Sequence, residues 1–147
     1  MSYAGGVRFA SFILGSLLFG FPLLAQAPSS EEALARVPLE DYLKGHATGD
    51  GSHMRKAFLP SAHIEGIREG KFASWTVDEH VATFSGKPSP EEAKRKHWIE
   101  KVEVTGSAAI GTIRFDYPAT KITDYMVLLK VNGEWKIANK VYAFHPK

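Results

Sequence analysis

The chain has 147 residues, of which 44% are apolar and 23% charged, and its formal net charge is +2. A chain of this length corresponds to one domain, and its apolar content predicts a globular fold over a disordered one. A net charge this close to zero argues against a nucleic-acid or anionic-membrane partner. The sequence has no cysteine, so disulfides are excluded and the hydrophobic core must stabilise the fold alone.

The N-terminal 27 residues have the layout of a secretory signal peptide. Arg8 precedes a long uncharged, mainly apolar run, and Ala25-Gln26-Ala27 places small residues at the −3 and −1 positions of a cleavage site. A transmembrane anchor is the alternative reading, but the run is slightly short for a span and Pro22 interrupts it. We therefore expect cleavage before Pro28.

Cleavage there leaves one mature domain at residues 28–147. Its formal charge is +1, because Arg8 is the only charged residue removed from a chain of charge +2. We expect an exported protein, periplasmic or secreted, with no membrane contact after cleavage.

Two helices are predicted to open the mature domain. Ser29 and Glu32 form a capping-box pattern, and Pro38 interrupts or restarts the helix that follows. An amphipathic stripe then recurs at the spacing of one helix face, and Gly49-Asp50-Gly51 ends it. The members of the stripe are Leu39, Tyr42, Leu43 and His46.

The second helix is short, with Ser52 as its cap and Met54, Ala57 and Phe58 pointing inward. Two short strands at residues 62–67 and 72–75 follow it. Another capping box, Thr76 with Glu79, then starts a helix that Gly86 and Pro88 terminate.

The remainder of the chain reads as four consecutive strands without an intervening helix. They are expected at about residues 95–105, 108–117, 121–131 and 134–144, and Asn132-Gly133 between the last two is a strong hairpin signal. Helices grouped before a run of antiparallel strands predict an α+β fold. A strongly twisted sheet of this length can curl around the helices and leave a pocket between the layers.

Alternation along the last two strands predicts which faces meet ligand and partner. On the final strand we expect the face of Trp135, Ile137 and Asn139 to form the pocket wall. On the preceding strand Asp124, Met126, Leu128 and Lys130 share a face that is too apolar for free solvent. A second subunit is the simplest cover for that face.

Three segments resemble the nuclear transport factor 2-like superfamily: residues 123–142 (TDYMVLLKVNGEWKIANKVY), 45–50 (GHATGD) and 60–66 (PSAHIEG). Within it, the chain is most similar to the SnoaL-like group labelled "putative lumazine-binding". The resemblance implies a cone-shaped α+β barrel with helices packed against a curved, mostly antiparallel sheet. It also implies a pocket inside the cone and a homodimer through the outer sheet face. The fold hosts isomerases, polyketide cyclases, dehydratases, hydrolases and non-catalytic binding modules, so it does not specify a reaction.

Two histidines are the best candidates for catalysis. His46 lies on the apolar stripe one turn after Tyr42, where it can serve as acid, base or ligand donor, or as a helix-end histidine bonded to backbone. His63 and Glu65 share one face of the first strand and can form a proton-transfer pair. In the ketosteroid isomerase branch the base is an Asp near this position. The nearest residue here is Glu65 or Gly66, and a shift of one residue reverses the face.

The expected ligand-binding residues are Tyr42, His46, Phe58, Trp75 and Asn139. Trp75 can stack on a flat ligand or close the end of the cone. Asn139 is the polar residue in an apolar row and needs a partner, either a ligand or a side chain such as His46. For Asp124 we expect ion pairing with Lys136 or Lys140, across strands or across a dimer.

We expect no metal and no cofactor, because the six histidines show no ligand spacing and the chain has no Gly-rich phosphate loop, nucleophile elbow or cysteine nucleophile. The leading hypothesis is an exported protein that binds a small organic ligand in its cone. The alternatives are an enzyme doing acid–base chemistry of the isomerase, cyclase or dehydratase type on a small ring compound, and a structural dimerisation module.

Overall fold

The computed structural model describes Met1 and residues 30–147. The signal peptide, its cleavage site and the Ser29 cap therefore lie outside the described residues. Among the helices of residues 30–147, none has the length and apolar character that crossing a bilayer requires.

The first helix, α1 (Ser30–Thr48), is continuous, so the expected break at Pro38 is wrong. A proline inside a helix costs a hydrogen bond, but Pro38 is buried with Ala35 and Leu39 on the face that packs on the sheet. Tertiary burial thus outweighs the local penalty. The helix ends as predicted at Gly49, which has φ 70° and donates its N–H to the carbonyl of Gly45.

The other helices are short. In α2 (Ser52–Ala57) the N-cap is Gly51 and not Ser52, while Met54 and Ala57 are buried as expected. The capping box of α3 (Val77–Val81) is confirmed, because the Thr76 side chain accepts from the N–H of Glu79 and the Glu79 carboxylate accepts from the N–H of Thr76. A single 3₁₀ turn, η1 (Glu92–Lys94), precedes the long strands.

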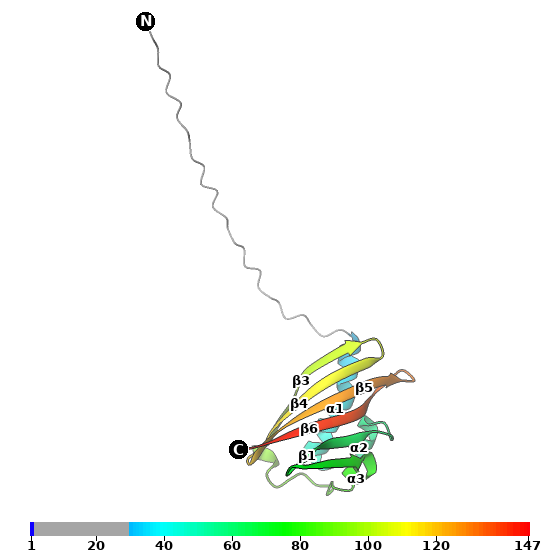
Figure 1. Cartoon of the computed structure of the whole chain (residues 1–147). Coiled ribbons are helices and arrows are strands. Elements are labelled where there is room, and N and C mark those ends of the chain that lie inside the picture. Colours follow the sequence, from blue (N-terminus) through cyan, green and yellow to red (C-terminus); the bar gives the residue numbers. More distant parts are fainter. Residues whose placement is uncertain (2–29) are drawn as a thin grey trace.

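Six strands form one curved sheet that runs across the molecule in the order β2-β1-β6-β5-β4-β3 (Figure 1). All neighbouring pairs are antiparallel except β1 with β6. The β5–β6 turn is the predicted hairpin, with positive φ at both Asn132 (51°) and Gly133 (84°). The bounds are β1 (His63–Arg68), β2 (Lys71–Thr76), β3 (Lys96–Thr105), β4 (Ala108–Asp116), β5 (Thr120–Val131) and β6 (Glu134–Pro146).

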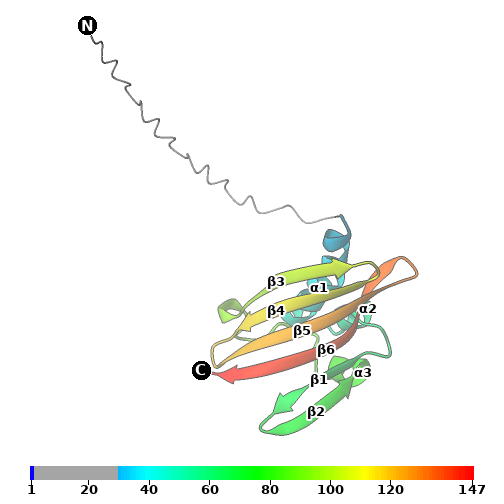
Figure 2. The same ribbon diagram turned by 45° about the horizontal axis from the view of Figure 1, so that its top comes forward.

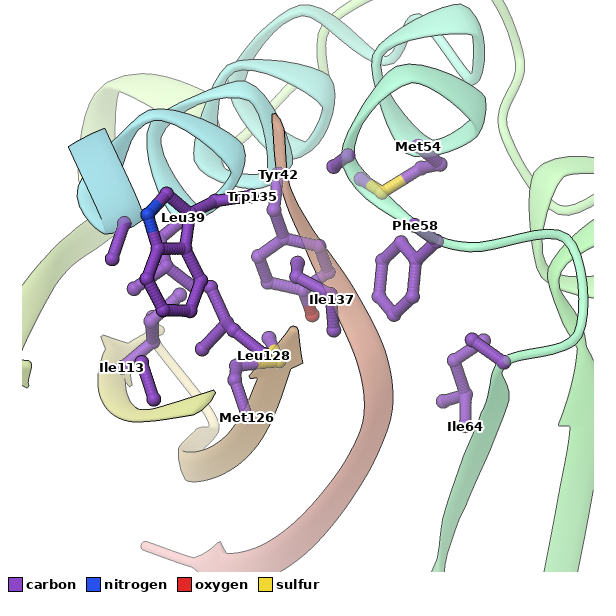
Figure 3. Close-up of a cluster of buried hydrophobic side chains, with 14 of the residues drawn as sticks. Leu39, Tyr42, Met54, Phe58, Ile64, Ile113, Met126, Leu128, Trp135 and Ile137 are labelled. Atoms are coloured by element: carbon purple, nitrogen blue, oxygen red, sulfur yellow. The ribbon is translucent and has the colours of Figure 1, made fainter. Parts of the chain in front are cut away.

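All helices lie on one face of this sheet, which confirms the predicted α+β architecture (Figure 2). The core fills the space between α1, α2 and the inner sheet face, and Tyr42 stands in its middle with the hydroxyl pointing away from α1 (Figure 3). Gly111 on β4 allows this close packing, because a Cβ there would lie 2.7 Å from a methyl group of Leu39.

The predicted assignment of faces is wrong for β5. Asp124, Met126 and Leu128 are buried against the helices, whereas Tyr125 and Val127 are half exposed. Both faces of β5 are apolar enough to form a core, so the pattern within the strand could not distinguish them. The helices select the face that carries Asp124.

The face of β6 changes part-way along the strand. Val127 pairs with Asn139 and Leu128 pairs with Ile137, so Ala138 is an extra residue in a β-bulge. Trp135 and Ile137 point inward before the bulge, and Lys140 and Tyr142 are the buried residues after it. The prediction that Asn139 continues the Trp135 row is therefore wrong.

Candidate active site

A pocket opens at one end of the cone, between α1, α3, the β1–β2 hairpin and the inner sheet face. Its cavity volume is ≈ 120 Å³. That is below the roughly 300–1,000 Å³ of pockets that hold drug-sized ligands, so the space suits only a small molecule. Much of the wall consists of aromatic and aliphatic side chains from five strands, namely Ile64, Trp75, Phe115, Ile122, Tyr142 and Phe144.

A buried ion pair with a tyrosine lies in the pocket wall. Lys140 Nζ is 3.1 Å from Asp124 Oδ2 and donates to the Tyr42 hydroxyl at 2.7 Å, and that hydroxyl donates to Asp124 Oδ2 at 2.6 Å. Asp124 is 1% exposed and Lys140 6%. Two buried charges need each other and further hydrogen bonds to be tolerated in a core, and Tyr42 supplies a bond to each.

The second carboxylate oxygen of Asp124, Oδ1, is buried and has no hydrogen-bond partner among the described residues. A buried carboxylate oxygen without a donor is costly and marks a place for a ligand group or a proton. Desolvation by burial, with the charge of Asp124, raises the pKa of Tyr42 well above its ordinary value. Tyr42 therefore remains a protonated donor and holds Oδ2, which leaves Oδ1 available.

Two histidines face this ion pair from the helices. Desolvation, with the positive charge of Lys140, lowers the pKa of His46 well below its ordinary value and lowers that of His80 to about 4. Both are neutral near pH 7, and Nε2 of each is buried without a partner among residues 30–147. Aromatic edges hold His46 in place, with ring centroids 4.7 Å from Tyr42 and 5.1 Å from Phe115.

Two more tyrosines line the pocket with unpartnered hydroxyls. Burial raises the pKa of Tyr117 to about 12, and burial likewise raises the pKa of Tyr142. Each is thus a proton donor at neutral pH, and neither hydroxyl has a hydrogen-bond partner in the described part of the chain. The rings of Tyr142 and Trp75 stack, with their centroids 6.1 Å apart. The Tyr142 ring packs against Gly66, where a Cβ would lie only 2.5 Å from it.

The structure brings together three of the residues that the sequence singled out. Tyr42, His46 and Trp75 all line the pocket. Phe58 is instead buried behind it, with its ring 5.8 Å from that of Tyr42 and its backbone bridged to Ile137. Whether the three pocket residues bind a ligand stays a prediction.

The other two candidates lie elsewhere. The His63 side chain is exposed at the start of β1, and its backbone N–H donates to the Asn139 side-chain oxygen at 2.9 Å. Asn139 also donates to Glu65, so the amide joins two strands instead of facing the pocket. The reason is the bulge at Ala138, which turns Asn139 away and Lys140 inward.

The expected ion pair of Asp124 with Lys140 across neighbouring strands is confirmed, but sequence reasoning missed that the pair is buried in the pocket wall. It also passed over His80. A usable signal was present in the sequence. Asp124 lies on an apolar strand face two residues before Met126, and Lys140 lies on a strand face two residues before Tyr142. Across residues 30–147, no cluster of three or more His, Asp or Glu side chains has a metal-binding arrangement.

Residues 30–143 match the family described as "Putative lumazine-binding". The chain belongs to this family. A structure of a nuclear transport factor 2-like protein of unknown function from Shewanella baltica is similar over 83% of this chain and 100% of that one, with a TM-score of 0.71 and 30% identity. The chain is therefore a nuclear transport factor 2-like domain.

Two further proteins are less similar. The aldolase FrzH of a Cladobotryum species is 25% identical over 108 residues, which cover 72% of this chain and 85% of FrzH. The CaMKII hub of S. rosetta shares the fold at 19% identity and a TM-score of 0.57, over 81% of this chain and 100% of the hub.

Proposed function

We propose that this protein is an enzyme that moves a proton on a carbon next to a carbonyl group of a small, mainly apolar ligand. The observation that carries the proposal is Asp124 in the pocket wall. One of its carboxylate oxygens is held by Tyr42 and Lys140, and the other is buried and unpartnered. A carboxylate fixed in this way is positioned to act as a general base.

In the proposed step, Asp124 Oδ1 takes a proton from the α-carbon, the electron pair of the C–H bond forms a C=C bond, and the π pair of the C=O bond moves to oxygen to give an enolate. The hydroxyls of Tyr117 and Tyr142 donate hydrogen bonds to that oxygen, because both remain protonated. If the ketone carries a neighbouring C=C bond, the enolate is conjugated and takes the proton back from Asp124 at its γ-carbon, which gives an isomer. Otherwise its α-carbon attacks a second carbonyl carbon, and the alkoxide that forms takes the proton from Asp124, which gives an aldol product.

The relative named aldolase FrzH supports this reaction class, because an aldol step requires such an enolate. The apolar walls support a ligand with a ring or hydrocarbon body and few polar groups.

Proton exchange tests the proposal even while the physiological substrate is unidentified. A panel of small aromatic ketones, including 4-acetylbenzamide, is incubated with the protein in D₂O, and loss of the α-proton signal is followed by NMR. The wild type is expected to accelerate exchange for at least one ketone. Asp124→Asn should reduce that rate by at least about a hundredfold, since positioned general bases contribute 10²–10⁴.

The matched control is Asp116→Asn. Asp116 is a carboxylate at the end of β4 that pairs with Lys147 and does not line the pocket. This variant should exchange at the wild-type rate. Equal exchange in the Asp124 and Asp116 variants, or none above background in the wild type for any ketone, would contradict the proposed function.

A binding function without chemistry is the second candidate. The stacked pair Trp75 and Tyr142 presents flat aromatic surface at the pocket, which suits a planar ring ligand. The family description makes lumazine the natural first compound for a thermal-shift titration. A shift in the wild type that Trp75→Ala weakens, together with no proton exchange on any ketone, would favour this candidate.

We also propose that the protein is a homodimer through the outer sheet face. Neighbouring strands expose a continuous apolar surface there, which we call the outer patch: Ile110, Tyr125, Val127, Leu129 and Val141. An exposed apolar patch on a sheet is typical of a protein interface. The face differs from the one expected from sequence, because Asp124 and Met126 point inward.

Export remains a proposal that rests on the layout of residues 1–27. Expression in a bacterial host with separation of periplasm and cytoplasm tests it. The mature protein should appear in the periplasm with Pro28 as its first residue by mass spectrometry, and full-length protein in the cytoplasm alone would contradict it.

A further inference from the structure

A second hollow lies behind the two histidines and shares them with the site pocket. His46 and His80 line both, with ring centroids 6.1 Å apart, so the two hollows adjoin at these rings. The second hollow has an empty volume of ≈ 520 Å³ including its opening to solvent. We call it the basic chamber, and its polar lining includes Thr83, Ser85, Lys87 and Arg95.

Arg95 forms an ion pair with Glu92 that lacks a hydrogen bond. Its guanidinium lies 3.7 Å from the carboxylate of Glu92, beyond hydrogen-bond distance, and sits over the Tyr117 ring at 4.4 Å. Its Nε is buried and has no hydrogen-bond partner among the described residues. A buried guanidinium N–H with no acceptor is costly, and an oxyanion is the group that best fits its donor geometry.

The surroundings of Arg95 favour an anion further. Nε2 of His46 and of His80 is also buried and unpartnered among residues 30–147, and each neutral ring can carry its proton there and donate. Lys87 adds a positive charge at the rim. Two carbonyl groups at the nearby end of α1 already accept hydrogen bonds, because Gly49 N–H donates to Gly45 O and Gly86 N–H donates to Gly49 O. Glu92 is the acid that competes for Arg95.

We propose that the basic chamber binds an oxyanion, a carboxylate or phosphate, which Arg95 and the Nε2–H groups of His46 and His80 hold. The anion comes either from solution or as the acidic group of the ligand in the adjoining pocket. In the second case the proposal rests on the proposed function and adds that the carbonyl substrate is an organic acid. The ligand body then contacts Asp124, and its acid group lies on the far side of the histidines.

The test compares two ligands that differ only in charge, 4-acetylbenzoate and 4-acetylbenzamide, and adds inorganic phosphate alone. Binding is measured by calorimetry and thermal shift on the wild type, Arg95→Gln, Lys87→Gln and the control Lys94→Gln. Lys94 is an exposed cation next to Arg95 that does not line the chamber. The wild type should bind the acid about ten-fold more tightly than the amide, as expected for a charge-assisted hydrogen bond.

Arg95→Gln should abolish this preference, Lys87→Gln should reduce it about three-fold through loss of a partly screened charge, and Lys94→Gln should leave it unchanged. Stabilisation by phosphate that Arg95→Gln removes indicates a free anion. A preference for the acid without any effect of phosphate indicates the acidic group of the pocket ligand. No preference and no phosphate effect, or either effect surviving in Arg95→Gln, overturns the proposal. If Arg95→Gln fails to fold, the reduction of about three-fold expected of Lys87→Gln, a substitution at an exposed position, still tests the proposal.

The result can be separated from that of the proposed function. Proton exchange on the uncharged 4-acetylbenzamide tests Asp124 without the chamber. Exchange by the wild type with neither a preference for the acid nor stabilisation by phosphate would leave the function standing and the chamber rejected. A preference for the acid that depends on Arg95, without proton exchange on any ketone, would support the basic chamber and reject the proposed function.

Discussion

The two faces of β5 differ in a way that inverts the usual expectation. The inner face carries a full negative charge at Asp124 and is buried, whereas the outer face carries Tyr125, Val127 and Leu129, which are 52%, 49% and 40% exposed. Hydrophobic burial alone would favour the opposite arrangement. The charge is tolerated inside because Lys140 and Tyr42 both donate to Oδ2 of Asp124 there.

The difference shows where each kind of function resides. A charge is retained in a core only if it is paired, and such a pair commonly marks chemistry instead of stability. An apolar patch left in solvent commonly marks a partner. In this domain the two signals lie on alternate residues of one strand, so the sheet separates the proposed ligand side from the proposed partner side.

The largest expected effect is on the inner face. Lys140→Met leaves Asp124 buried without its counter-ion and should lower the free energy of unfolding by about 3–5 kcal/mol, measured by urea denaturation. Lys121→Met, which removes an exposed lysine from the same sheet, should change it by less than about 0.5 kcal/mol. Adding Asp124→Asn to Lys140→Met should recover part of the lost free energy of unfolding. Similar effects of Lys140→Met and Lys121→Met would contradict a stabilising role of the Asp124–Lys140 ion pair.

The buried histidines should make the stability depend on pH. The pKa of His80 is lowered to about 4 in the folded protein, so between pH 6.5 and 4 only the unfolded chain takes up this proton. The free energy of unfolding should therefore fall as the pH is lowered through that window, by up to about 3 kcal/mol for this group. His46 contributes with the same sign.

The variant His80→Gln tests the pH effect. It should flatten the dependence of the unfolding free energy between pH 6.5 and 4, whereas His63→Gln, at an exposed position, should not. An unchanged slope in His80→Gln would show that this residue does not cause the dependence.

On the outer face, Val127→Glu places a charge in the middle of the outer patch, where Val127 pairs with Ile110. The dimer dissociation constant should rise by about a hundredfold or more, since a charge without a partner is costly to bury. Light scattering after gel filtration measures it, and circular dichroism should show a folded monomer. The neighbouring Met126→Glu should unfold the domain instead, because Met126 is 1% exposed. A wild type that is monomeric at all concentrations would reject the interface.

The smallest effect compares two tyrosines on opposite sides of the sheet. Tyr42→Phe removes the hydroxyl that bonds Asp124 and Lys140 and should cost about 1.5 kcal/mol, the lower end for hydrogen bonds to charged groups. Tyr125→Phe, on the outer face, should cost less than about 0.5 kcal/mol. Chemical denaturation resolves the two, and equal costs would mean that the Tyr42 bonds add nothing to stability.

Local chemistry in the sequence determined much of the fold. The four long strands follow from residue alternation, the β5–β6 turn follows from the positive φ that Asn132-Gly133 permits, and the start of α3 follows from the capping pair of Thr76 and Glu79. Each of these signals acts over a few residues. The placement of Tyr42 and His46 on one inward stripe of α1 is likewise a local property.

The assembly of the candidate site was decided by tertiary structure. Tyr42 meets Asp124 and Lys140 across 82 and 98 residues of sequence, and no local pattern encodes a contact of that range. Which face of β5 is buried depended on where the helices pack, because both faces are apolar. The single extra residue at Ala138 then exchanged Asn139 for Lys140 at the pocket, because one residue reverses the faces of a strand.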